Sequence, residues 1–165
     1  MSYELVTPSD AEDRICFTYG ANSLFNKIVL MSTYRAKNIK TEGGRSAVDD
    51  YSMSENERDF FKLQVEYALA EVYSRVVRLT TKIAGLTIST TGDSFFYIKD
   101  YDAYNTNVLL LVDKAIEKAL INFILRDWYM HSGLSAEYGA YELILASSLN
   151  ELTEKLFELR KPLLS

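Results

Sequence analysis

The sequence predicts a mainly α-helical protein: an antiparallel bundle of three long helices and a shorter N-terminal helix, with one β-hairpin between the first two long helices. Three long segments carry apolar residues three and four positions apart, and helix-starting or helix-ending residues flank them. An alternating stretch follows the first of these segments. A chain of 165 residues suits one domain. We expect an N-terminal arm and loop at residues 1–53 and the bundle core at residues 54–165.

The first long helix is expected over residues 54–85, with the rest of the chain organised around it. Ser54 and Glu57 have the spacing of a capping box, and Gly85 suits the left-handed position just past a helix end. The main apolar stripe comprises Phe61, Val65, Leu69, Val72, Val76, Leu79 and Ile83. A second stripe, which includes Tyr67, widens the apolar arc, so this helix should have neighbours on more than one side.

The hairpin is expected at residues 86–99. Residues 85–101 alternate in polarity, and residues 91–94, Thr-Gly-Asp-Ser, supply the turn. Phe95 and Tyr97 fall on one face and their apolar neighbours on the other. Because an isolated hairpin is marginally stable in water, this one should either contact another chain or fold over the bundle.

The second and third long helices are expected over residues 102–133 and from Ser135 to about Arg160. Asp102 or Asn105 can cap the second helix, and Gly133 can end it. Its core stripe comprises Leu109, Val112, Ile116, Leu120, Phe123 and Ile124. In the third helix, Gly139 costs about 1 kcal/mol relative to alanine, which suggests close packing against another helix. The pair at residues 147–148, Ser-Ser, suggests the same.

The first 53 residues are less regular. Residues 8–13 are typical of a turn leading into a short acidic helix start, and residues 15–19 fit either a strand or a helix end. Residues 22–36 have helical spacing, although their β-branched and aromatic content keeps a strand as the alternative. Residues 40–53 predict a long docking or linker loop. Its Gly43-Gly44 lacks the lysine and bracketing glycines of a phosphate-binding loop.

Composition excludes several classes of protein. The net charge of −5 argues against a nucleic-acid-binding footprint. A single cysteine, Cys16, excludes an internal disulfide framework, and with one histidine, His131, it cannot form a usual zinc site. No apolar run is long enough to cross a bilayer, and the first residues lack the pattern of a signal peptide. We therefore expect no membrane association and synthesis in the cytoplasm.

The residues do not suggest an enzyme, and we expect no cofactor and no metal. Catalysis by His131 would need a partner arrangement that the sequence does not show, since no serine has the Gly-x-Ser-x-Gly context. The carboxylates considered as candidates are Glu66, Glu71, Glu117 and Asp127. Glu66 and Glu71 are five residues apart and do not share a helix face, and no Glu-x-x-His pair of the di-iron type exists.

The order of elements resembles a known family. An acidic loop, a capped long helix, an apolar hairpin and two more long helices, over residues 33–160, are similar to the small head-tail connector (adaptor or head-completion) proteins of tailed bacteriophages. The stretch TYRAKNIKTEGGRSAVDDYSMSENERDFF also resembles structural proteins of phages of Bacteroides-like hosts, including crAss-like phages.

This resemblance implies a non-enzymatic virion subunit that forms a homo-oligomeric ring between the portal and tail proteins, with DNA passing through the lumen without sequence-specific binding. It also implies that the N-terminal segment, the 40–53 loop and the C-terminal tail dock on neighbours. The residues expected at protein interfaces are Phe95, Tyr97, Arg45, Tyr51, Leu163 and Leu164. The alternative is a small bacterial helical module for protein-protein interaction or regulation.

Overall fold

The computed structural model describes the backbone of residues 2–6, 14–39, 47–79, 83–88, 94–99 and 105–159, and the side chains of residues 17–39, 47–76, 105 and 107–159. The protein is mainly α-helical. Its helices are α1 (Ala21–Lys37), the short α2 (Val48–Tyr51), α3 (Arg58–Leu79), α4 (Leu109–His131) and α5 (Ser135–Leu159). Its strands are β1 (Ser2–Val6), β2 (Arg14–Tyr19), β3 (Ile83–Ile88) and β4 (Ser94–Lys99).

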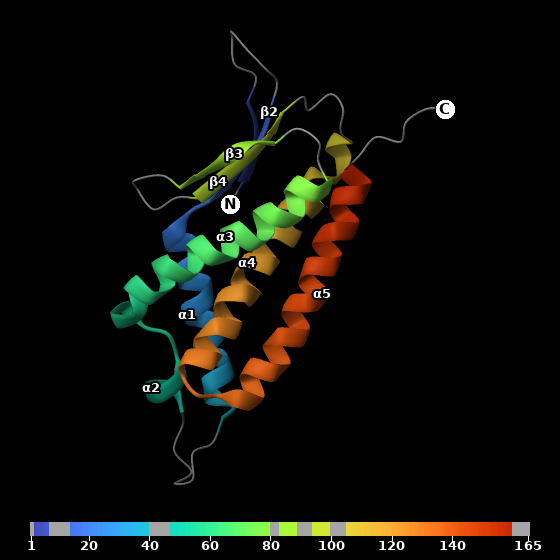
Figure 1. Ribbon diagram of the computed structural model, residues 1–165. Helices are drawn as coiled ribbons and strands as arrows, with labels where there is room; N and C mark the ends of the chain where they lie inside the picture. Colours follow the sequence, from blue (N-terminus) through green and yellow to red (C-terminus); the bar gives the residue numbers. More distant parts are fainter. Residues whose placement is uncertain are drawn as a thin grey trace.

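The helix α4 lies at the centre of the structure, with α5, α3 and α1 packed around it (Figure 1). The helices α4 and α5 form an antiparallel pair joined by a tight turn at Gly133, which has a φ of 75°. Leu134 N–H donates to the Tyr129 carbonyl and Gly133 N–H donates to that of Met130, which is the Schellman arrangement. Gly133 therefore ends the helix as predicted.

The capping box at the start of the first long helix is confirmed. Ser54 N–H donates to Glu57 Oε2 at 2.7 Å, and Asn56 N–H donates to Ser54 Oγ at 3.3 Å. A 3₁₀ turn at Glu55–Glu57 leads into α3. The predicted C-terminal end was wrong, because Ile83 and Gly85 belong to strand β3. The hairpin strand β3 begins earlier than predicted, and its pairing with β4 takes up the last residues assigned to the helix.

Four strands form one antiparallel sheet in the order β1-β2-β4-β3, across one end of the helices (Figure 1). The strands β3 and β4 pair over the stretch predicted as a hairpin. This hairpin does not stand alone, because β2 of the same chain pairs with the other edge of β4. Residues 15–19, left open between strand and helix, lie in β2. The strand β1 was not anticipated.

The N-terminal part of the chain belongs to the core. Phe17 and Tyr19 of β2 and Leu24 and Ile28 of α1 are fully buried in the same apolar cluster as α3, α4 and α5. The end of β2 and the helix α1, which were predicted as part of an N-terminal arm, thus contribute to the core. The helix predicted at residues 22–36 is confirmed as α1.

Other local predictions had mixed outcomes. The short helix α2 replaces part of the predicted 40–53 loop. Gly139 is exposed, and no atom lies within 4 Å of where its Cβ would be, so the expected close packing there was wrong. Ser148, in contrast, is fully buried between α4 and α5. The predictions for residues 8–13 and Asp102 and for the helix end at Arg160 fall outside the described residues.

Candidate functional site

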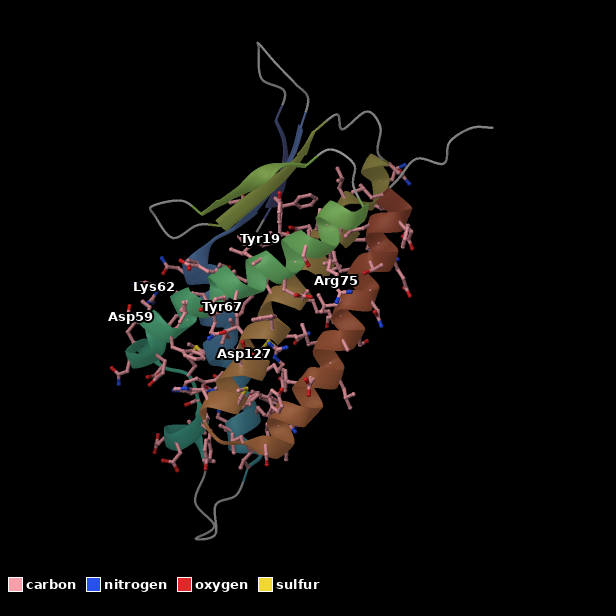
Figure 2. All side chains as sticks on the ribbon, in the orientation of Figure 1. Tyr19, Asp59, Lys62, Tyr67, Arg75 and Asp127 are labelled. Atoms are coloured by element: carbon pink, nitrogen blue, oxygen red, sulfur yellow. The ribbon has the colours of Figure 1, made fainter. Side chains whose placement is uncertain are left out.

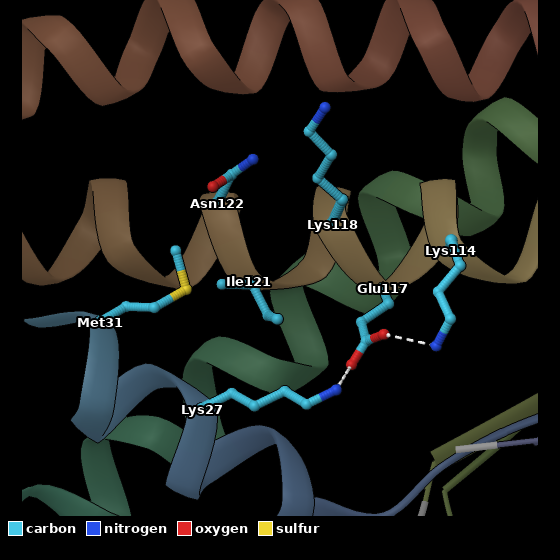
Figure 3. A pocket seen from close by; sticks show the side chains of 7 residues that line it. All are labelled: Lys27, Met31, Lys114, Glu117, Lys118, Ile121 and Asn122. Carbon is cyan, nitrogen blue, oxygen red and sulfur yellow. Dashed lines mark hydrogen bonds and ion pairs between the residues drawn. The ribbon is translucent and has the colours of Figure 1, made fainter.

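A groove runs along α1 where this helix meets α4 and the start of α5. It consists of two adjoining hollows of about 490 Å³ and 250 Å³ that share Met31. We call it the α1 groove. The larger hollow is lined by Leu30, Met31, Tyr34, Arg35, Asn38 and Tyr141. The smaller is lined by Lys27, Met31, Lys114, Glu117, Lys118, Ile121 and Asn122 (Figure 3).

The wall of the groove follows from the spacing of residues in α1. Leu24, Ile28 and Ser32 recur at four-residue steps and face the core. Leu30 and Tyr34, also four apart, lie on another side of the helix, where they are 69% and 72% exposed. An amphipathic helix normally keeps its apolar residues on the buried side, so this second apolar row requires another explanation.

The polar groups of the smaller hollow are already paired with one another. Glu117 is almost fully buried and accepts from Lys27 and, at 3.3 Å, from Lys114 Nζ (Figure 3). Lys118 Nζ lies 2.6 Å from Glu151 Oε2. Asn122 Nδ2 donates to Ser148 Oγ at 2.7 Å. These pairs fix α4 to α1 and α5, so a structural role accounts for them.

Asp113 is a second buried carboxyl group on α4, only 1% exposed. Burial raises its pKa above the ordinary value, while the hydroxyl of Tyr19 and the ammonium of Lys114 act in the opposite direction, lowering it. Nearby Glu117 raises the pKa further. This carboxyl group therefore holds its proton to a higher pH than an exposed aspartate does.

A second apolar surface lies on the outer side of α3. Leu63 and Tyr67 are four residues apart and 46% and 54% exposed. The charged residues Asp59 and Lys62 lie on α3 before Tyr67 (Figure 2), and exposed Glu66 precedes Tyr67 in the sequence. We call these five residues the α3 ridge. The sequence predicted that the apolar stripe containing Tyr67 packs against a neighbouring helix. The exposure of Tyr67 shows that this prediction was wrong at this position.

A hollow of about 270 Å³ lies between α3 and the end of α4, lined by Phe60, Gln64, Asp127, Met130 and His131. The exposed ring of His131 lies 4.9 Å from that of Phe60 and 6.0 Å from that of Trp128, measured between centroids. Aromatic contacts of this kind account for the position of the histidine without a chemical role.

Three of the predicted interface residues lie in the described part of the backbone, in two different elements. Phe95 and Tyr97 lie in the central strand β4, opposite residues of both β2 and β3, and their side chains are outside the described set. Tyr51 lies in α2, where its carbonyl accepts from Trp128 Nε1 at 2.8 Å and anchors α2 to α4. The remaining predicted interface residues, which lie outside the described residues, are Arg45, Leu163 and Leu164.

The four carboxylates considered for catalysis are also dispersed. Glu71 pairs with Arg75 at 3.3 Å, and Asp127 pairs with Arg126 at 2.6 Å. Glu66 is exposed on α3, and Glu117 has the lysine partners described above. Within the described ranges, no three histidine, cysteine or carboxylate side chains gather where they could hold a metal ion.

The comparisons with known proteins add no relative: no family model matches the chain, and neither a curated protein nor a solved structure is significantly similar to it. Among the helices that the structure describes, none has both the length and the apolar composition needed to cross a membrane.

Proposed function

We propose that this chain is a non-enzymatic structural subunit of a tailed-bacteriophage virion, which forms with copies of itself the ring between portal and tail. The observation that supports this proposal is the presence of two unlike apolar surfaces, the α1 groove and the α3 ridge. A subunit of a ring contacts two neighbours through two different surfaces, whereas a subunit of a simple dimer needs only one.

In this proposal the long helices act as an antiparallel bundle that gives the ring its wall. DNA passes through the lumen without sequence-specific contacts, and the net charge of −5 limits its adhesion to the protein. The N-terminal segment, the 40–53 loop and the C-terminal tail are the regions that would contact portal and tail proteins.

A second candidate function is that of a small helical module that binds one partner protein. The α1 groove favours it, because a groove between helices with an apolar floor accepts the apolar face of an amphipathic helix. Such a module would use the groove alone and would leave the α3 ridge unoccupied.

The mass of the purified protein in solution separates these functions. We would measure light scattering over a concentration series, with the protein alone and mixed with a tailed-phage portal protein, and examine each sample by negative-stain electron microscopy. A closed ring of one size, alone or only with portal protein, is the expected result. A monomer or dimer that persists in both conditions would contradict the connector function and favour the binding module.

A further inference from the structure

We propose that the α3 ridge of one copy packs into the α1 groove of the next, so that copies associate head to tail. This inference rests on the proposed function, because it names the two surfaces through which copies of the chain would assemble. Three properties of these surfaces support it: their shapes, their charges and their places in the fold.

The shapes are complementary. Leu63 and Tyr67 are four residues apart on a helix, and side chains at this spacing form a convex row that packs into grooves between side chains or helices. The α1 groove is concave, and its larger hollow of about 490 Å³ has apolar walls at Leu30, Met31 and Tyr34. A tyrosine ring in such a hollow would bury a large apolar area and could keep its hydroxyl hydrogen-bonded at the edge.

The charges are complementary as well. On the ridge, Asp59 already pairs with Lys62 at 3.2 Å, so the net negative charge there is that of Glu66, which is exposed. Along the groove, Lys27, Arg35 and Lys118 each have a carboxylate partner within the chain and still keep roughly half of their side chains in solvent, where a neighbour's carboxylate can approach them. The ion pair between Arg35 and Glu137 is 3.5 Å long and Arg35 is nearly half exposed, so its guanidinium group can also reach a carboxylate of a neighbour while it stays beside Glu137.

The same charges disfavour the symmetric alternatives. Ridge against ridge would bring the Glu66 carboxylates of two copies together, and groove against groove would leave both hollows empty. Like charges across an interface cost free energy and suppress that pairing. Ridge against groove is the arrangement that pairs opposite charges and fills the hollow.

The two surfaces lie on opposite sides of α4. Figure 1 shows α3 in front of α4 with α1 behind, and Figure 3 shows the groove from the other side, with α3 behind α4. One copy can therefore contact two neighbours at once without a clash between them. A contact of this kind repeats from copy to copy, and it closes into a ring if the rotation between neighbours divides a full turn.

Two variants and their mixture test the proposal. Tyr67→Asp disables the ridge and leaves the groove, and Leu30→Asp disables the groove and leaves the ridge. We expect each to raise the dissociation constant for self-association about 30-fold or more, as loss of a central interface residue does. When mixed, the two variants should form a one-to-one dimer and nothing larger, because only one intact ridge and one intact groove remain.

Phe157→Asp is the matched control, because Phe157 on α5 is as exposed as Tyr67 and lies in neither surface. It should assemble as the unchanged protein does. All three variants should keep the helical circular dichroism and melting temperature of the unchanged protein, since the replaced side chains are exposed. Native mass spectrometry and light scattering give the masses.

The outcomes separate this inference from the proposed function. Rings that form equally well with both variants would overturn the ridge-groove contact and leave the connector function standing. An open filament that both variants abolish would support the contact and contradict a closed ring. A pair of variants in which one alone dimerises would show a symmetric contact and overturn the inference. An unchanged protein that stays monomeric up to about 1 mM, both alone and mixed with portal protein, would overturn both.

Discussion

The helices α3 and α4 have nearly the same length, 22 and 23 residues, but very different surroundings. The helix α4 has buried residues on every side, including the polar side chains of Asp113, Glu117 and Asn122. The helix α3 buries one side and leaves Leu63 and Tyr67 in solvent on the other. A wide apolar arc thus marks a central helix in one case and an unpartnered surface in the other.

The difference lies in which apolar residues have partners within the chain. Along most of α4 the buried residues face α5, α3 or α1, so even its buried polar groups must find partners inside the protein. In α3 the outer row meets only solvent in a single copy. We therefore expect α4 to determine the stability of the fold and the outer side of α3 to determine association. Four measurements of stability test this contrast.

The largest loss of stability should come from shortening a buried side chain in the centre of α4. Leu120 is 1% exposed, so Leu120→Ala should lower the free energy of unfolding by about 2–5 kcal/mol through lost burial and a residual cavity. Leu63→Ala, on the exposed side of α3, should change it by less than about 1 kcal/mol. Urea denaturation followed by circular dichroism measures both, and equal losses would contradict the contrast between the helices.

A somewhat smaller effect is expected for the buried polar pair that joins α4 to α5. Ser148→Ala leaves the buried amide of Asn122 without its acceptor, which should cost about 1–3 kcal/mol of unfolding free energy. The half-buried Ser74 of α3 donates only to its own helix at Glu71, so Ser74→Ala is the control and should change stability by about 0.5 kcal/mol or less. A large loss for Ser74→Ala would show that α3 also depends on hydroxyl contacts.

Ser54 should make a smaller contribution to stability, which acts only at the start of α3. Ser54→Ala removes the acceptor for the Asn56 N–H and should cost about 1 kcal/mol of unfolding free energy. Ser54→Asp keeps a side-chain oxygen in the capping position and should retain most of the stability. Thermal melts of both variants give the comparison, and an unchanged melting temperature for Ser54→Ala would mean that packing alone sets this end of α3.

The smallest effect is expected for Asp113, as a change of the unfolding free energy with pH. Because burial raises its folded-state pKa, the folded protein binds this proton more tightly than the unfolded chain does. Its contribution to stability is therefore present at low pH and is lost as pH rises through the folded-state pKa. Asp113→Asn cannot ionise, so its unfolding free energy relative to the unchanged protein should increase from pH 4 to pH 8.

The control for this titration is Asp59→Asn, which removes one carboxylate from the exposed surface of α3 and so corrects for the change in net charge. Urea denaturation at several pH values gives the two differences. A difference for Asp113→Asn that stays flat, or that falls with pH, would contradict a proton held by the folded state.

Local patterns predicted much of the helical structure and little of the candidate site. The capping box at Ser54, the helix α1 and the stop at Gly133 each depend on residues within one or two turns, and the sequence indicated them correctly. The α1 groove depends on three helices, whose residues lie up to about a hundred positions apart. The row of Leu30 and Tyr34 could have been noticed as apolar positions outside the core stripe.

The sequence by itself determined the helical class, because periodicity, caps and a left-handed glycine act over a few residues and need no distant partner. The boundary between helix and hairpin needed the three-dimensional structure, because Ile83 fits the helical period of α3 and yet pairs with Ile98 of β4. The tertiary structure also decided that α4 and not α3 lies at the centre. Both helices have a wide apolar arc, and only packing reveals which arc the chain itself covers.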